Sequence, residues 1–525
     1  MILEIYIVMQ KFELNSQWWR NVLLTMFLVF FVAQTTSATE VLRQRGCRVG
    51  TLSPQFRTRR AQALLNGENP YIGNRRQLVV LAAFQNQDFA NGGHAALEKW
   101  NRIFNVQNYN EGMYAGSVHD YFISQSYGQF NVTFDLVQLT LPDVQHKYRS
   151  TYSHDEYSQY MVDDIVDILQ TEDIDWSLYD WDGDAYVDQL LIIYAGKGMN
   201  DGGGSNTIWP HQWWLSQHMN LETEDMTDYR SYRTVSRGDQ TYIIDCYCCV
   251  QEVMNGGVGS TFGTICHEFS HCFGFPDFYY GDSTTVGDWD LMDNGNYGGS
   301  GFRPCGYSAH ERMLMGWLTP TELTTSVTIT DMPSLCDEPQ AYLIRNDDWP
   351  NEFYIIENRQ QHDWDESLPG SGILIFHIDY DKEIWEGCAS VPNNNQKKRY
   401  SLFPANNSTK SRTIADWAYP YFVTDSLGND SVLNDCLTDT SAPAAILNNE
   451  RADGSLLMSK PITHMRVNAQ GLASFDFMQD ETDAIDLVSA KWQDDEYYTL
   501  DGRRLSGSPV KSGIYVNGGK KVVIK

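Results

Sequence analysis

The chain has 525 residues, of which 42% are hydrophobic and 13% aromatic, and its formal net charge is −30 at pH 7. A chain of this length exceeds what one hydrophobic core usually serves, so we expect two or three domains, and the aromatic content argues against disorder. So acidic a protein would repel phosphate backbones, which excludes nucleic acid as an expected partner.

The first 38 residues have the pattern of a secretory signal peptide. Basic residues precede an apolar run from 22 to 33, and small residues at 36–38 then provide a cleavage site. The run is shorter than the ~20 residues that span a bilayer, and a single membrane anchor is the alternative interpretation. We therefore expect a secreted or cell-surface protein, in which residues 39–75 form a pro-segment or linker.

Export would place the ten cysteines in an environment that allows disulfides. Cys246, Cys248 and Cys249 are too crowded to pair freely with one another. A thiolate metal site is an alternative for these three residues, but the sequence lacks a matching second pair at zinc-ribbon spacing. The pairing of the cysteines is therefore left open.

Strands and helices alternate between about residues 76 and 320, which predicts an α/β or α+β domain. The continuous apolar run at 78–81 is typical of a buried strand, and we interpret 187–194 as another buried strand. Ser117 and Asp120 have the spacing of a capping box, which predicts the start of a helix. A further helix is predicted by four apolar residues at helical spacing: Val162, Ile165, Val166 and Leu169.

Carboxylates recur in this domain at the spacing of a calcium-binding loop. Four aspartates occupy positions 1, 3, 5 and 9 of such a loop: Asp180, Asp182, Asp184 and Asp188. Oxygen ligands at this spacing suit a hard cation. Leu191 replaces the acid expected at position 12, and the segment leads into a predicted strand rather than a helix. We interpret the segment as a calcium site, with an ordinary acidic turn as the alternative.

The segment His-Glu-Phe-Ser-His at 267–271 predicts a metal-binding helix. Histidines four residues apart project from the same face of a helix, so His267 and His271 can both reach one ion. An apolar stripe on the opposite side would anchor the helix in a core, and it consists of Phe262, Ile265, Cys266, Phe269 and Phe273. We therefore expect the histidines to face a cleft.

The residues after this helix complete a predicted zinc site. Gly274 can adopt a positive φ and turn the chain back, so that Asp277 becomes a third ligand beside the histidines. Imidazoles and a carboxylate would hold zinc with one position open for water, whose pKa zinc lowers to about 7. Glu268 would take a proton from that water as general base and deliver it to the leaving amine.

Further candidates around the metal are weaker. Met292 follows the second histidine in Trp-Asp-Leu-Met-Asp, and a Met-bearing turn lies beneath the metal in metzincin-like enzymes, although a methionine is otherwise core filler. Tyr297 and His377 are candidates for stabilising an oxyanion, but each is more readily explained as structural. Cys47 in the predicted pro-segment is a candidate latency cap on the zinc.

From about residue 321 the chain shows short strands between turn-rich segments, which favours a β-sandwich-like region over 321–480. The expected strands lie at 327–329, 354–356, 373–378 and 475–477. After an acidic linker, residues 495–525 predict two hairpins with turns at Asp501-Gly502 and Asn517-Gly518. These hairpins would form a small separate β module.

These motifs resemble the immune inhibitor A family of secreted bacterial metallopeptidases. The resemblance spans roughly residues 77 to 380 and is carried mainly by 267–277, 289–293 and 307–318. Shorter similar stretches lie at 124–128, 208–211, 357–359 and 368–372.

The resemblance implies that His267 and His271 bind zinc and that Glu268 is catalytic. Metzincins more often use a histidine as third ligand, so an acidic residue downstream of Asp277 is an alternative for that role. The C-terminal end, from 498 to 525, looks like the sorting tail of the type IX secretion route. That likeness implies the secretion machinery as a partner and a host with two membranes.

The sequence thus predicts an α+β protein with a zincin or metzincin-like catalytic domain, a β-sandwich-like region and a C-terminal β module. The predicted function is a secreted zinc-dependent endopeptidase acting on extracellular protein or peptide substrates, with Ca2+ as a second candidate ion. One alternative is a catalytically inactive surface adhesin or binding protein that retains the fold, which the complete motif disfavours. Another is a zinc hydrolase of small-molecule esters or amides.

Overall fold

The computed structural model describes residues 69–150, 157–221, 223, 228–254, 257–280, 285–385, 392–394, 396–424, 430–479, 497–499, 503, 505, 509, 511, 513–517 and 520–524. The predicted signal peptide at 1–38, residues 39–68 of the predicted pro-segment with Cys47, and the Asp501-Gly502 turn lie outside the described residues. Within the described ranges, no helix is both long enough and apolar enough to cross a membrane. The chain divides into two compact units.

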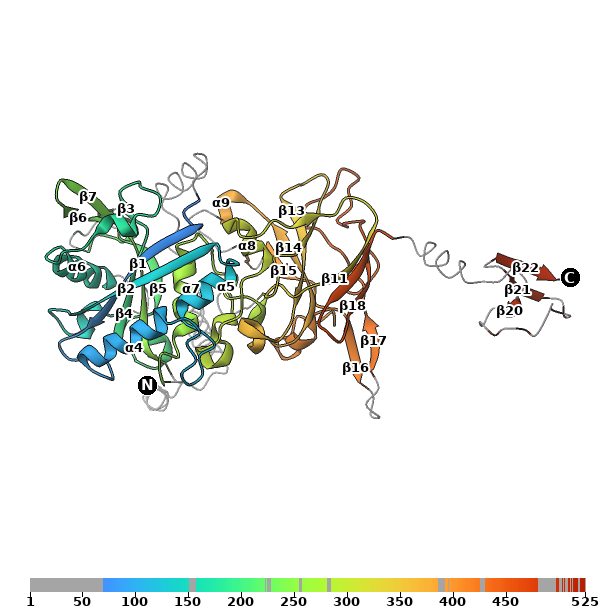
Figure 1. Cartoon of the computed structure of the whole chain (residues 1–525). Helices are drawn as coiled ribbons and strands as arrows, with labels where there is room; N and C mark the ends of the chain where they lie inside the picture. Colours follow the sequence, from blue (N-terminus) through green and yellow to red (C-terminus); the bar gives the residue numbers. More distant parts are fainter. Residues whose placement is uncertain are drawn as a thin grey trace, which may run out of the picture. The chain divides into compact units, whose positions relative to one another are not determined.

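The first unit is built on a mostly parallel sheet with the strand order β2-β1-β4-β8-β5 (Figure 1). Its strands are β1 (Gly73–Ala83), β2 (Phe130–Thr140), β4 (Leu190–Lys197), β5 (His211–Trp214), β8 (Cys246–Met254) and β9 (Gly257–Val258). β1 pairs in parallel with β2 and β4, and β4 pairs in parallel with β8, whereas β5 and β9 are antiparallel to β8. Residues 78–83 of β1 are at most 2% exposed, as a strand covered on both faces requires. The predicted strand at 78–81 is confirmed.

The α-helices of this unit are α4 (Gly93–Asn105), α5 (Val118–Gln125), α6 (Ser158–Leu169), α7 (Phe262–His271), α8 (Ala309–Met315) and α9 (Lys382–Trp385). The predicted capping box is present at α5, where the Ser117 hydroxyl accepts a hydrogen bond from the Asp120 amide and the Asp120 carboxylate accepts one from the Ser117 amide. α6 buries all four apolar residues that predicted it. Both helices are therefore confirmed.

The buried strand predicted at 187–194 is confirmed over 190–194, which lie in β4, but its start is wrong because Val187 belongs to another sheet. β3 (Tyr186–Val187) pairs in parallel with β7 (Gln240–Ile244), which pairs with β6 (Arg233–Arg237) in a separate sheet. The backbone changes direction at Asp188, whose amide donates to the Tyr179 carbonyl at 2.9 Å. An apolar run reports burial but does not say which sheet buries it.

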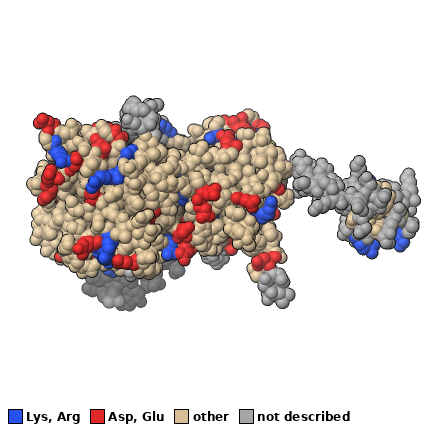
Figure 2. Space-filling view, viewed as in Figure 1, with Lys and Arg blue, Asp and Glu red and all other residues tan. Residues whose placement is uncertain are grey.

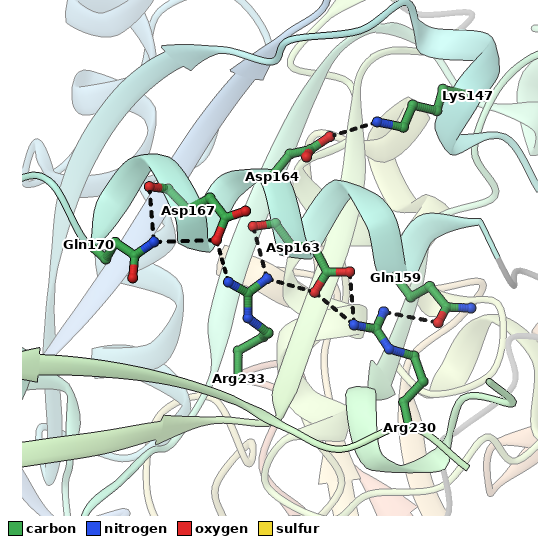
Figure 3. Close-up of polar contacts among 8 residues, drawn as sticks. All are labelled: Lys147, Gln159, Asp163, Asp164, Asp167, Gln170, Arg230 and Arg233. Carbon is green, nitrogen blue, oxygen red and sulfur yellow. Dashed lines mark hydrogen bonds and ion pairs between the residues drawn. The ribbon is translucent and has the colours of Figure 1, made fainter. Parts of the chain in front are cut away.

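A cluster of charged side chains fastens the segment 230–233 to α6 (Figure 3). Asp163 accepts from Arg230 at 2.8 Å and from Arg233 at 2.9 Å, and its side chain is 18% exposed. Arg233 also pairs with Asp167, nearer the C-terminus of α6. On the face shown in Figure 2, basic side chains are likewise scattered among acidic ones rather than gathered into one patch.

The first unit extends beyond Thr319, because residues 360–369 and 376–402 also belong to it. Trp364 stacks on Phe262 of α7 with ring centroids 5.7 Å apart. The end of β14 (Gly372–Asp379) pairs antiparallel with β15 (Tyr400–Leu402). These returning segments therefore supply side chains to the core around α7.

The second unit consists of residues 320–359, 370–375 and the chain from 403 onward. Up to residue 479 its described strands are β10 (Thr321–Glu322), β11 (Val327–Met332), β12 (Tyr342–Arg345), β13 (Glu352–Arg359), the start of β14, β16 (Tyr421–Thr424), β17 (Asp430–Asn434), β18 (Ile462–Val467) and β19 (Ala473–Phe477). One sheet contains β10-β12-β13-β14 and another β11-β19-β18, and side chains from both enter one hydrophobic core. All four strands predicted for this region are present.

The C-terminal residues form a three-stranded antiparallel sheet, and backbone hydrogen bonds from Thr499 to Arg503 and from Leu505 to Tyr497 join the two sides of the first predicted turn. β21 (Gly513–Asn517) pairs with both β20 (Tyr497–Thr499) and β22 (Lys520–Ile524). Asn517 pairs with Lys520, so the hairpin between β21 and β22 turns at the predicted position.

Candidate metal centre

α7 carries the predicted metal-binding residues and is buried along its whole length. His267 and Glu268 are each 3% exposed, and His271 is 0% exposed. The predicted apolar stripe is therefore packed into the core, and the cleft expected beside the histidines stays a prediction. On the apolar side, Phe269 packs on Phe122 with ring centroids 4.9 Å apart.

Both imidazoles are oriented by backbone carbonyls. Nδ1 of His267 lies 2.9 Å from the Leu291 carbonyl oxygen, and Nδ1 of His271 lies 2.7 Å from that of Phe275. A ring that donates from Nδ1 keeps the lone pair on Nε2, where a metal binds. Both rings are therefore oriented so that Nε2 is the nitrogen available to a metal.

Asp277 brings a carboxylate between the two histidines, as predicted for a third ligand. Its Oδ1 atom lies 3.2 Å from Nε2 of His267 and 3.5 Å from Nε2 of His271. Both Asp277 oxygens and Nε2 of His271 are buried and lack a hydrogen-bond partner. Leaving buried polar atoms unsatisfied costs about 1–3 kcal/mol each, and a divalent cation bound among them would remove that cost. The donor set of two nitrogens and a carboxylate fits zinc.

The carboxylate of Glu268 lies beside the two imidazoles. His267, Glu268 and His271 each offer a ligand atom, and these atoms all lie within 4.8 Å of one another. A carboxylate so close to the two imidazoles is positioned to exchange a proton with a group bound there.

Burial is the largest influence on the pKa of both histidines. It lowers the pKa of His271 to about 4, so that this ring is neutral. Burial also lowers the pKa of His267, but Asp277 and Glu268 act in the opposite direction, and the pKa of His267 rises to about 9. The two carboxylates thus create a negative potential where a cation would bind.

The turn that carries Met292 contacts both sides of this centre. Leu291 supplies the carbonyl for His267, and the Met292 carbonyl accepts from the Phe278 amide at 2.9 Å, immediately after Asp277. Met292 itself is 0% exposed. The turn therefore fixes the first histidine and the acidic ligand candidate relative to each other.

Acidic side chains give this turn its shape. Asp293 accepts from the amides of Thr285, Val286 and Gly287, each at 2.9 Å. Asp290 accepts from the Tyr400 hydroxyl at 2.7 Å. Sequence reasoning missed Tyr400, which lies 110 residues away along the chain and carries no motif of its own.

Two glycines are required by the geometry of α7. A Cβ atom at Gly263 would lie 1.8 Å from the Asn296 carbonyl oxygen, so only glycine allows this close approach. Gly274 has a φ of 91° and donates from its amide to the His271 carbonyl, which ends the helix as predicted.

The structure brings three of the four predicted calcium ligands together. Asp180, Asp182 and Asp188 each offer an oxygen within 4.8 Å of the others. Asp184 instead accepts from the Tyr186 amide at 2.8 Å. Burial raises the pKa of Asp188 well above its usual range, and Asp182 raises it further. Calcium at this loop stays a prediction.

The remaining candidates lie elsewhere. Tyr297 is 50% exposed in the segment after the turn, and His377 is 4% exposed in β14. Their role as oxyanion donors stays a prediction.

The three crowded cysteines, Cys246, Cys248 and Cys249, lie on β8, and the described cysteines form no disulfide with one another. Burial raises the pKa of the Cys248 thiol well above its usual range, which disfavours the thiolate metal site.

Comparison with known proteins gives the family. The family model described as "Immune inhibitor A peptidase M6, catalytic domain" matches residues 26–315. Immune inhibitor A from Bacillus thuringiensis subsp. alesti is 28% identical over 165 residues, a match that covers 29% of this chain and 22% of that protein. The match thus spans well under two thirds of that relative. Because the family model covers more than half of the chain, including all of α7, the chain belongs to the immune inhibitor A family of M6 peptidases.

Proposed function

We propose that this protein is a secreted zinc-dependent endopeptidase. His267, His271 and Asp277 hold the zinc, and Glu268 is the general base. The observation that carries this proposal is the convergence of two carbonyl-oriented imidazoles on one unsatisfied, buried carboxylate oxygen, at 3.2 and 3.5 Å. An acidic residue downstream of Asp277 is the alternative third ligand.

When bound, zinc supplies a Lewis acid that polarises the scissile carbonyl and lowers the pKa of an attacking water. The chain's own residues do the rest. Glu268 accepts a proton from the water and transfers it to the nitrogen of the leaving amine. The carbonyls of Leu291 and Phe275 hold the imidazoles in place throughout, so that the ligands do not reorganise during the reaction. The buried surroundings strengthen these electrostatic interactions.

The proposed domain arrangement follows the sequence. A zincin or metzincin-like catalytic domain occupies 76–320 and is completed by residues 360–369 and 376–402, the rest of 321–480 forms a β-sandwich-like region, and 495–525 form a sorting module. This arrangement is supported by the mostly parallel sheet that packs against α7 and by the hydrophobic core that two sheets share in the second unit.

Export is supported by residues 1–38, which have the pattern of a signal peptide. The likeness of residues 498–525 to a sorting tail supports recognition by secretion machinery. Protein or peptide substrates follow from the peptidase family.

The test compares the mature protein with its Glu268→Gln variant. We expect about one zinc per chain by mass spectrometry in both proteins, and hydrolysis of casein only by the first. Loss of a general base typically costs ~10²–10⁴-fold in rate. Glu98→Gln, at an exposed glutamate of α4, is the matched control and should keep full activity. Mature protein without zinc, or a Glu268→Gln variant with undiminished hydrolysis, contradicts the proposal. A protein that binds its zinc but hydrolyses nothing would favour the inactive binding protein.

A further inference from the structure

A pocket of about 270 Å³ lies next to the Met-bearing turn, in the first unit. Its lining is mostly polar: the side chains of Asp288, Asn294, Tyr297 and Ser367 form its walls together with several glycines and Cys305. Pockets for drug-sized ligands measure ~300–1,000 Å³, so this one suits a single amino-acid side chain rather than an extended ligand.

The pocket is built from the same hydrogen-bonded loop that orients His267. The Gly295 amide donates to the Asp290 carbonyl at 2.8 Å, and the Asn294 amide donates to the Gly287 carbonyl at 3.1 Å. Asp290 directly precedes Leu291, whose carbonyl accepts from His267. The pocket walls and the carbonyl that orients His267 therefore belong to one continuous loop, residues 287–295.

Asp288 supplies the charge of the pocket. Among the described lining residues it is the only carboxylate, and none of them is lysine, arginine or histidine. The nearby Arg303 is paired with Glu366, so these two charges offset each other. Asp293 and Asp290 do not line the pocket: Oδ2 of Asp293 accepts from three backbone amides, and Asp290 accepts from the Tyr400 hydroxyl. Asp288 has no ion-pair partner in the part of the chain that the structure describes.

Asp288 is an exposed residue whose carboxylate still contacts the pocket walls, and the protein around it raises its pKa. A cation entering the pocket would stabilise the charged form of this group. Tyr297, which is 50% exposed, offers a ring face along which the aliphatic part of a long basic side chain can lie. The walls therefore combine a charge with an aromatic surface, which is the chemistry that a lysine or arginine side chain complements.

We propose that this pocket binds a lysine or arginine side chain of the peptide substrate, and that Asp288 is the residue that sets this preference. The inference rests on the proposed peptidase function and specifies its substrate class. Asp288 acts on selectivity rather than on chemistry, because a neutral side chain at the same position would lose only the charge contact.

The first experiment measures binding without hydrolysis. The zinc-loaded Glu268→Gln protein is titrated with two fluorescent peptides that differ only in one residue, lysine in one and glutamine in the other, placed in turn at each position around the cleaved bond. We expect one position at which the lysine peptide binds roughly ten times more tightly, in line with a partly exposed pocket contact. Asp288→Asn should remove this difference, whereas Asp173→Asn, at a carboxylate that is 94% exposed, should leave it intact.

The second experiment uses the active protein. Asp288→Asn should lower kcat/KM for the lysine peptide about tenfold and leave the glutamine peptide unchanged. Asp288→Lys should turn the preference toward glutamate. Equal affinity of the two peptides at every position, absence of binding by both, or an equal loss for both peptides in Asp288→Asn overturns the inference. Hydrolysis without a basic preference defeats this inference alone, whereas absence of zinc and of hydrolysis defeats the proposed function.

Discussion

The Nδ1 atom of His267 lies 2.9 Å from the carbonyl oxygen of Leu291, and this contact joins α7, the candidate metal-binding helix, to the turn that carries Met292. The same turn bonds to the backbone just after Asp277, through the Met292 carbonyl and the Phe278 amide. The position of one histidine and that of the carboxylate are thus set by two consecutive carbonyls. A change that moves the turn should therefore disturb the metal site before it disturbs the rest of the fold.

Met292→Ala tests this dependence. Truncating a fully buried methionine should cost about 2–5 kcal/mol of stability, and the loosened turn should lower zinc affinity ~10–100-fold. Met315→Ala in α8 is the matched control, because Met315 is equally buried but does not lie in the turn. Urea unfolding should show comparable losses, while chelator competition should show weaker zinc binding only for Met292→Ala. Equal zinc affinity in the two variants would reduce Met292 to core filler.

Asp277→Asn tests the third ligand. Asp277 Oδ1 lies between the Nε2 atoms of His267 and His271, and the substitution removes the negative charge of this carboxylate. Zinc affinity should fall by about 10²-fold or more, because the metal loses a charged ligand. Asp288→Asn, three residues before Leu291, is a control that should bind zinc normally. Competition with a chromogenic chelator measures both. Unchanged affinity in Asp277→Asn would assign the ligand to a different acidic residue.

We expect the buried His310 to make the folded protein less stable at acidic pH. Burial lowers its pKa to about 3, so the unfolded state, with a histidine pKa of about 6.5, binds the proton more readily. The neutral His310 therefore does not reduce the free energy of unfolding above pH ~6.5. As the pH falls from ~6.5 toward the pKa of the folded state, the free energy of unfolding decreases by up to about 1.4 kcal/mol per pH unit. His310→Phe keeps an aromatic ring beside Trp385 and Tyr400. We expect a shallower decline of unfolding free energy between pH 6 and 4, measured by urea titration, and an identical slope would contradict it.

The charge cluster on α6 should contribute to stability through Asp163. This carboxylate serves two arginines, and all three side chains are at most 25% exposed. We expect Asp163→Asn to cost about 1–3 kcal/mol because it weakens two charge-assisted hydrogen bonds. Asp167→Asn, at a side chain that is 56% exposed, should cost at most about 1 kcal/mol. Equal losses of stability for Asp163→Asn and Asp167→Asn in thermal unfolding would contradict a special contribution from the two arginine contacts of Asp163.

Sequence reasoning grouped the candidate metal ligands correctly in space because the signals that group them are local. The spacing of His267 and His271 follows from helix periodicity, and Gly274 and Asp277 follow within a few residues. The capping box at Ser117 and the strands of the second unit are local in the same sense. All of these features were predicted at the correct positions.

Non-local features could not be predicted in the same way. The carbonyls of Leu291 and Phe275 are backbone atoms, which carry no residue-specific signal, and Tyr400 meets Asp290 only through the tertiary fold. The split of the run at 187–194 depends on which sheet each half joins. Complete burial of α7 likewise depends on segments that lie far away in the sequence, including Trp364.

Residues 360–369 and 376–402 belong to the first unit, and this limits where the chain can be cut into fragments that fold. A recombinant fragment that stops at Thr319 would leave Phe262 without the indole of Trp364 and Asp290 without the hydroxyl of Tyr400. Because segments of the second unit alternate with these stretches along the chain, no single cut separates the peptidase half from its neighbour. Gene fusion or shuffling would have to carry both units together, so they are expected to be inherited as one block.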